Sequence, residues 1–249
     1  MQGIAEWFPV SSSGHLVVLE KLLGFVNGGI SFDVAIHFGT LMAVFVYFGK
    51  DIVDMVEDIL RGRWKSEKGK LFWLLILSTL PAGIFGYLFY NVFETGFDSL
   101  GVVSIGFGIT GLLLSIASIK KGVGKSIDKV DWKIALLIGF AQMVALVPGV
   151  SRAGATIVAG ILLGLREKDA IKFSFLMSIP AIFGASILTF GNERLPASLI
   201  WATLVSFVVG LGAIYALSTF ILQNRKNLRW FALYVFVLMI LVGSWALIK

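Results

Sequence analysis

Two apolar stretches of this chain are each interrupted by a short run of proline, glycine, serine and charged residues. The first stretch covers residues 2–24 and breaks over 9–14, and the second covers 132–164 and breaks over 148–154. Each half is roughly 8–16 residues long, which is shorter than the roughly 20 residues that a helix needs to cross a bilayer. Proline lacks a backbone donor and glycine permits unusual dihedral angles, so each break predicts a turn between two short helices.

The surrounding chain has the composition of an integral membrane protein. It is 57% hydrophobic and 14% charged, with a mean hydropathy of +0.91, whereas soluble domains carry about 25% charged residues. Irregular backbone is tolerated at membrane depth only where it is buried in protein or lines a cavity. We therefore expect both broken stretches to be re-entrant helix–loop–helix hairpins. The absence of cysteine excludes disulfides and thiolate chemistry.

Six further stretches are long and apolar enough to span a bilayer. They lie at about 31–49, 71–91, 99–119, 169–190, 197–222 and 229–248. The predicted fold class is an all-α polytopic membrane protein with six transmembrane helices and two re-entrant hairpins, forming one domain over 1–249. The first motif follows Met1 at once with no basic segment, so we expect no cleavable signal peptide and either a late start site or a short missing leader.

The basic residues are distributed unevenly among the loops. If each hairpin leaves on the side that it enters, the loops at 50–70, 120–133, 165–172 and 223–229 share one face. They hold six, five, three and three of the 21 lysines and arginines, while the other face has Lys21, Arg194 and Lys249. Such an excess marks cytoplasmic loops, which also accounts for the net charge of +6 without a nucleic-acid partner.

The two halves of the chain correspond to each other. Gln2 and Gly14 match Gln142 and Gly154 at a constant offset of 140, and both halves carry a Pro-x-x-Ser sequence. With hairpins entering from opposite sides, this similarity predicts inverted repeats, at about 1–91 and 132–222, whose hairpins meet near the midplane.

The hairpins hold the ionisable and hydroxyl groups that could do chemistry. Ionisable groups at membrane depth persist mainly where they face a cavity or serve a function. Helix starts rich in serine and glycine bind anions through free backbone N–H groups, and an arginine fork suits phosphate. A histidine or serine can act as nucleophile or as its activator, beside a carboxylate that takes a proton or holds a cation. The candidates are Glu6, Ser11, Ser12, Ser13, Gly14, His15, Ser151 and Arg152.

Structural roles compete with each of these assignments. The serines could simply cap a helix, Glu6 and His15 could be a satisfied buried pair, and Arg152 could neutralise Glu6. Asp33 and His37 lie one turn apart, which favours a polar contact within one helix. Trp7 is interpreted as an interfacial anchor rather than a substrate contact.

The motifs resemble those of a known family, the bacitracin-resistance undecaprenyl-diphosphatases (BacA/UppP). Residues 6–16, EWFPVSSSGHL, look like its first signature, and residues 148–156, PGVSRAGAT, look like its second. Residues 32–40 and 173–185 also lie where the family has related stretches. The likeness covers nearly the whole chain, and two signatures in order are specific.

The resemblance implies an enzyme that removes the terminal phosphate of a C55 polyprenyl diphosphate, leaving the monophosphate lipid carrier. It implies catalytic roles for Glu6, Ser12, His15 and Arg152, and substrate-binding roles for Ser11, Ser13, Ser151, Gly154 and Thr156. It further implies a divalent cation, Mg²⁺ or Ca²⁺, held by Glu6 and Gln2. Many members have an acidic residue where this chain has Gln2, which keeps an oxygen ligand but loses the charge.

The expected setting is the plasma membrane, with the active site opening towards the outer face and a membrane lipid as substrate. The activity would confer bacitracin resistance and support cell-envelope glycan synthesis. The oligomeric state is open, with a homodimer as one option. The alternative is a transporter or flippase for a phosphorylated lipid, because inverted repeats with broken helices also describe secondary transporters. The residues alone do not decide whether Ser12 or His15 is the nucleophile.

Overall fold

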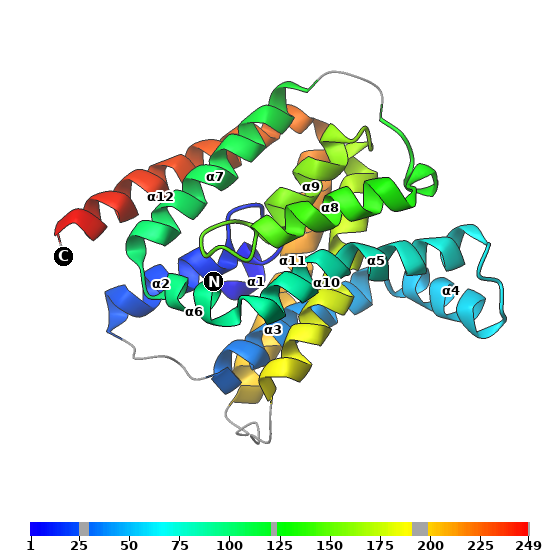
Figure 1. Cartoon of the computed structure of the whole chain (residues 1–249), viewed down its shortest axis with the longest axis horizontal. Coiled ribbons are helices and arrows are strands. Elements are labelled where there is room, and N and C mark those ends of the chain that lie inside the picture. The colour runs from blue at the N-terminus through cyan, green and yellow to red at the C-terminus, as the bar shows by residue number, and fades with distance from the viewer. Residues whose placement is uncertain (25–29, 121–123, 191–198, 249) are drawn as a thin grey trace.

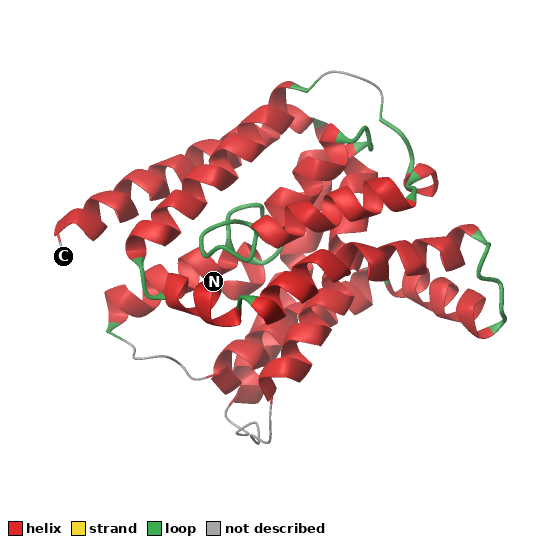
Figure 2. Cartoon of the chain, in the orientation of Figure 1, coloured by secondary structure: helices red, strands yellow, loops and turns green. Residues whose placement is uncertain are grey.

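The computed structural model describes all residues except 25–29, 121–123, 191–198 and 249, and the described residues are almost entirely helical (Figures 1 and 2). The α-helices are α1 (Gln2–Ala5), α2 (Ser12–Leu23), α3 (Ile30–Tyr47), α4 (Gly49–Leu60), α5 (Glu67–Leu88), α6 (Tyr90–Phe97), α7 (Leu100–Ile119), α8 (Trp132–Val144), α9 (Arg152–Leu162), α10 (Glu167–Phe190), α11 (Leu199–Gln223) and α12 (Leu228–Ile248). The protein is therefore an all-α polytopic membrane protein, as its sequence predicts.

Five of the six expected spans coincide with helices, or with a bent pair of helices, that are long and apolar enough to cross a membrane. Helices α5, α7, α11 and α12 each meet the requirement alone, and α3 meets it together with α4. The sixth expected span lies in α10, a 24-residue helix whose first turn is charged. The prediction of a plain loop over 50–70 is wrong, because residues 49–60 form α4, bent by 80° from α3. Apolar and charged residues alternate there with helical period, which favours an amphipathic helix.

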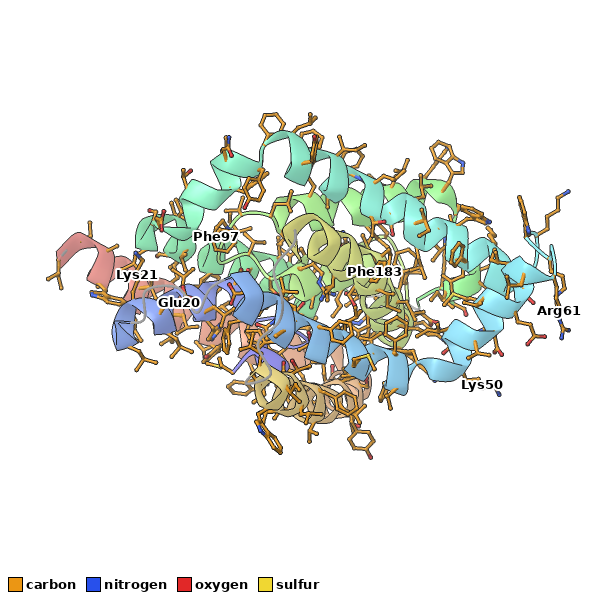
Figure 3. All side chains as sticks on the ribbon, turned by 90° about the horizontal axis from the view of Figure 1, so that it is seen from below. Glu20, Lys21, Lys50, Arg61, Phe97 and Phe183 are labelled. Atoms are coloured by element: carbon orange, nitrogen blue, oxygen red, sulfur yellow. The ribbon has the colours of Figure 1, made fainter. Side chains whose placement is uncertain are left out.

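The four basic loops lie together on one face of the molecule, as the charge pattern predicts. Bonds that join them link Lys172 with Asp51 (2.7 Å), the Asp169 carboxylate with the Ile127 N–H (3.1 Å), and Arg225 with both Glu167 and the Lys120 carbonyl. Figure 3 shows Lys50 and Arg61 at the opposite end of the molecule from Glu20 and Lys21. The uneven distribution of basic residues inferred from the sequence is thus present in the folded chain.

Helices from the two predicted repeats pack across each other. Helix α5, from the first half, packs on α8 and α10, whereas α11, from the second half, packs on α3 and α1. Helices α7 and α12 pair along their lengths at one side of the molecule (Figure 1). Each broken hairpin is therefore covered by a long helix of the other half. The repeat limits of 1–91 and 132–222 stay a prediction.

Both interrupted stretches form two helices joined by a loop, and the two loops lie at the centre of the molecule (Figure 2). The breaks begin earlier than expected. Helix α1 ends at Ala5, so its break begins at Glu6 rather than Pro9, and α8 ends at Val144, before Pro148. The first half-helix is thus only four residues long, shorter than predicted. Glu6 follows α1 with dihedral angles that are still helical (φ −66°, ψ −39°), and its carboxylate faces the second loop.

Candidate functional site

A serine caps the helix that follows each break, at equivalent positions in the two halves. The Ser11 hydroxyl accepts from the Gly14 N–H at 3.2 Å, and the Ser151 hydroxyl accepts from the Gly154 N–H at 3.0 Å. Ser11 and Ser151 are again separated by 140 positions. The Gly14 N–H, one of the backbone groups expected to be free for an anion, is therefore already bonded, as is the Gly154 N–H, and both serines are buried. Capping is the structural role that the sequence left open for them.

Close backbone packing against α7 holds the second loop in place. Gly149 has φ +88°, a region that only glycine adopts readily, and a Cβ atom there would lie 2.2 Å from the Val103 carbonyl oxygen. A Cβ on Gly106 would lie 2.2 Å from the Pro148 carbonyl oxygen. The hydroxyl of Thr110 completes the contact, since it donates to the Gly149 carbonyl at 3.1 Å and accepts from the Ser151 N–H at 2.9 Å. The start of α9 is thereby fixed.

Glu6 and Arg152 join the two loops. Arg152 Nη2 lies 2.6 Å from Glu6 Oε1, across 146 positions of sequence, and Glu6 is only 7% exposed. A charge-assisted bond of this length is among the stronger hydrogen bonds in proteins. The structure thus brings together the carboxylate and the guanidinium that the sequence singled out, and they neutralise each other as one interpretation expected.

The other oxygen of the Glu6 carboxylate accepts two further bonds. Ser12 Oγ donates to Glu6 Oε2 at 2.7 Å, and Gln2 Nε2 donates to the same oxygen at 2.9 Å. Ser12 lies in the first turn of α2, immediately after its cap. A hydroxyl that donates to a carboxylate has a base within reach of its proton, which is the arrangement of an activated nucleophile.

Exposure separates the accessible candidates from the buried ones. Ser12, Ser13 and Arg152 are partly exposed, with Arg152 at 17%. Thr156 is buried, and its hydroxyl lies 2.6 Å from the Ser174 hydroxyl and 2.8 Å from the Arg152 carbonyl. Ser13 lies 3.2 Å from the Ser11 hydroxyl. A ligand can therefore reach Ser12 and Arg152 directly, whereas Thr156 supports the backbone of Arg152.

His15 bonds to a residue that the sequence did not suggest. Its Nδ1 lies 2.7 Å from the Ser11 carbonyl, and its Nε2 lies 2.8 Å from the hydroxyl of Tyr234 in α12. The interpretation of Glu6 and His15 as a bonded pair is wrong, because both ring nitrogens have these other partners. Ser12 and His15 are nevertheless three residues apart on α2, so they lie on neighbouring positions of one helical face.

His37 is a second imidazole beside the carboxylate. Its Nε2 lies 3.7 Å from Glu6 Oε2, and its Nδ1 lies 2.8 Å from the Asp33 carbonyl. The expected contact of His37 with Asp33 is thus made to the backbone oxygen. The Asp33 carboxylate has one oxygen, Oδ1, that is buried without a hydrogen-bond partner among the described residues.

Trp7 is a core residue, so its interpretation as an interfacial anchor is wrong. Its side chain has no exposed surface and packs edge-on against Phe175 at a centroid distance of 4.9 Å. The Arg152 guanidinium carbon lies 5.4 Å from the centre of the same indole ring. The physical reason is that the segment between α1 and α2 lies against the second loop and α10, so Arg152 and Phe175 cover the indole ring. Trp7 therefore contributes a cation–π contact to Arg152.

Comparison with known protein families assigns the chain to one of them. Residues 1–241 match the family described as "Bacitracin resistance protein BacA". The chain belongs to the BacA family. It is similar to proteins named undecaprenyl-diphosphatase from Rubrobacter xylanophilus (43% identical, covering 98% of this chain and 94% of that protein) and Caldicellulosiruptor bescii (39%, 100% and 95%). A third, from Teredinibacter turnerae, is 42% identical over 89% of this chain and 84% of its own length. The resemblance seen in the two signatures thus extends over nearly all of the BacA sequence.

Three contacts of this BacA site were not foreseen from the sequence. Tyr234 bonds to His15, Thr110 holds the second loop, and Ser174 bonds to Thr156. Each partner lies on another helix, and the Tyr234 pair is 219 positions apart. A tyrosine within an apolar span usually marks a membrane interface. Thr110 and Tyr234 lie on α7 and α12, outside the two predicted repeats, whereas Ser174 lies within residues 173–185, which the family resemblance had marked.

The oxygen groups near Glu6 suit a hard divalent cation only together with further ligands. Among the described residues no group of three or more histidine, cysteine, aspartate or glutamate side chains could hold a metal ion. Gln2 Oε1 is, however, buried without a hydrogen-bond partner within the described chain, beside the Glu6 carboxylate. Magnesium is commonly bound by one or two carboxylates plus substrate phosphates rather than by an all-protein cage. Glu6 and Gln2 fit that pattern.

Proposed function

We propose that this chain hydrolyses undecaprenyl diphosphate, or a closely related polyprenyl diphosphate, to the monophosphate lipid carrier and inorganic phosphate. The observation that carries the proposal is the meeting of Ser12, Glu6 and Arg152 at the junction of two broken hairpins inside an apolar helical bundle. The names of the relatives support the same activity. A lipid tail can stay among the apolar helices while its diphosphate reaches the polar junction. Bacitracin resistance and supply of the carrier for envelope glycans would follow from this activity.

The contacts favour Ser12 over His15 as the nucleophile. The Ser12 hydroxyl donates to the Glu6 carboxylate and Ser12 is partly exposed, whereas both ring nitrogens of His15 already have hydrogen-bond partners. In the proposed first step Ser12 Oγ attacks the terminal phosphorus, and its proton passes to Glu6. The bond from that phosphorus to the bridging oxygen breaks, and the lipid monophosphate leaves with the electron pair.

In the second step water attacks the phosphoserine, the P–Oγ bond breaks, and inorganic phosphate leaves. The proton that Glu6 took in the first step returns to Ser12 Oγ, and the phosphate leaves with the hydrogens of the water. Arg152 offers a planar fork of donors to the phosphate oxygens as negative charge builds up, which is the main source of catalysis in phosphoryl transfer. When bound by Glu6, Gln2 and the diphosphate oxygens, a divalent cation would neutralise part of that charge.

We also propose that the protein lies in the plasma membrane with the site open towards the outer face. The basic face then lies in the cytoplasm, in keeping with the rule for positive loops. Helix α2 leads from Ser12 towards Lys21, which Figure 3 shows at the end remote from Lys50 and Arg61. A substrate therefore approaches Ser12 from the side that carries few basic residues.

A phosphate-release assay with the purified chain tests the proposed function. Prenyl diphosphates of graded length are supplied in detergent micelles, with Mg²⁺, with Ca²⁺ and with a chelator, and the matching monophosphates serve as control substrates. The proposal expects one phosphate per diphosphate and none from the monophosphates. Movement of the headgroup across proteoliposome membranes without phosphate release would instead favour the transporter, which the phosphatase names of the relatives do not support.

A further inference from the structure

The hydroxyl of Tyr234 bonds to the buried His15, although the tyrosine ring lies at the surface of the bundle. Tyr234 is 43% exposed, whereas His15, to which its hydroxyl bonds, is 6% exposed. The two rings are nearly parallel, with an interplanar angle of 10° and centroids 5.7 Å apart. Helix α12 packs mainly along α7, and Tyr234, together with Phe231 against Phe8, connects this last helix to the first broken hairpin.

The hydrogen bonds of His15 determine which ring nitrogen carries the proton. A backbone carbonyl can only accept, so Nδ1, 2.7 Å from the Ser11 carbonyl, carries the hydrogen. In the neutral ring Nε2 then holds a lone pair, and the Tyr234 hydroxyl donates to it. The chain of bonds therefore leaves Nε2 as the basic nitrogen.

The surroundings permit little rotation of this imidazole. The edge of Phe107 packs against it at a centroid distance of 5.5 Å and an interplanar angle of 83°. Ser11, whose carbonyl holds Nδ1, has φ +68°, a strained value for a residue other than glycine. Strain of this kind persists where neighbouring structure enforces it, and here it directs the carbonyl towards His15. Tyr234 fixes the opposite end of the ring.

We propose that Tyr234 is a positioning residue for His15, holding the imidazole in one orientation through the bond between its phenolic hydroxyl and Nε2. The inference rests on the proposed hydrolysis for its catalytic consequence, but the effect on the ring itself does not depend on that reaction. Tyr234 acts through His15, which lies one helical turn from Ser12. Removing the phenolic hydroxyl alone isolates the effect of this hydrogen bond, because the aromatic stack remains.

Nitrogen NMR of the imidazoles tests the effect directly. The chain has only two histidines, His15 and His37, so protein labelled with ¹⁵N-histidine in detergent gives two sets of ring signals, and His37→Gln assigns them. We expect His15 to be protonated on Nδ1 near neutral pH in both wild type and Tyr234→Phe, because the Ser11 carbonyl is unchanged, and we expect the Nε2 signal to shift in Tyr234→Phe, because Nε2 loses its hydrogen-bond partner. Tyr215→Phe, on exposed α11, is the matched control and leaves the His15 signals in place. Unchanged His15 signals in Tyr234→Phe would overturn the proposal.

Kinetics then test the consequence for the reaction. We expect Tyr234→Phe to lower kcat about 10-fold, a fraction of the roughly 10²–10⁴-fold that a positioned acid or base contributes, with KM within about 2-fold. In the His15→Ala background the same change should have no further effect, because residues acting as a unit are not additive. An equal loss in both backgrounds would overturn a role through His15. If wild-type protein releases no phosphate, the proposed function fails, whereas the NMR result still decides the role of Tyr234.

Discussion

The carboxylate of Glu6 and the guanidinium of Arg152 meet at 2.6 Å, although 146 positions separate them in the sequence. Each residue lies at the break of a different hairpin, so the bond exists only when both hairpins are correctly placed. Burying a single charge at this depth would be costly, and pairing removes much of that cost. The ion pair is therefore both an assembly contact and the pre-formed centre of the site.

Replacing Arg152 tests these two roles separately. We expect Arg152→Ala to lower kcat/KM by about 10³-fold, since the donors to the developing phosphate charge are lost. The same change should lower the free energy of unfolding by about 3–5 kcal/mol, because the Glu6 charge is left buried and unpaired. Phosphate release and thermal unfolding in detergent measure the two effects.

The double variant Glu6→Gln/Arg152→Ala separates activity from stability. It removes both charges, so we expect thermal stability to recover relative to Arg152→Ala while activity does not recover. Stability that remains as low as in the single variant would show that the ion pair does not account for the loss.

Ser12 and Ser13 form a matched pair for testing the nucleophile. Both are partly exposed, but the Ser12 hydroxyl donates to Glu6, whereas the Ser13 hydroxyl lies 3.2 Å from the Ser11 hydroxyl. Removing one member of a catalytic unit typically costs a factor of about 10⁴–10⁶ in kcat. We therefore expect Ser12→Ala to abolish phosphate release to that extent and Ser13→Ala to retain most of it. Equal activity in the two variants would exclude Ser12 as the nucleophile.

The sequence predicts the helical class, the two breaks and the shared basic face, because hydropathy, proline, glycine and charge act locally. It does not predict that α5 and α11 cover the hairpins of the opposite half. A transmembrane helix is apolar on every side, so its hydrophobic pattern does not reveal which face meets a neighbour. The same limit explains why the bond of Tyr234 to His15 and the burial of Trp7 had no sequence signal. Both depend on where the hairpins dock.

Two glycines test how closely the second loop must approach α7. A methyl group on Gly106 would lie 2.2 Å from the Pro148 carbonyl oxygen, whereas one on Gly83 in α5 would meet no atom within 4 Å. Gly106→Ala must displace the loop that positions Arg152, and a misplacement of 1 Å can cost about 10²-fold in rate. Gly83→Ala should keep full activity and gain about 0.5–1 kcal/mol, the usual difference between alanine and glycine in a helix. Steady-state kinetics and thermal unfolding of both variants provide the measurement, and full activity in Gly106→Ala would refute the close approach.

Gln2 provides a test of the proposed cation site that does not depend on turnover. Gln2→Glu replaces a donor to Glu6 with a second carboxylate, and two adjacent buried carboxylates repel unless a cation lies between them. We expect the variant to be less stable than wild type in a chelator, and to gain more thermal stability from Mg²⁺ or Ca²⁺, because a ligand that binds only the folded state stabilises it.

Gln142→Glu is the matched control. It occupies the equivalent position of the second half, where Leu146 stands in place of Glu6, so the new carboxylate has no acidic neighbour at that spacing. We expect it to lower stability equally with and without cation. A cation-dependent gain of the same size in both variants would place the effect elsewhere in the protein, and no gain in Gln2→Glu would remove Glu6 and Gln2 as cation ligands.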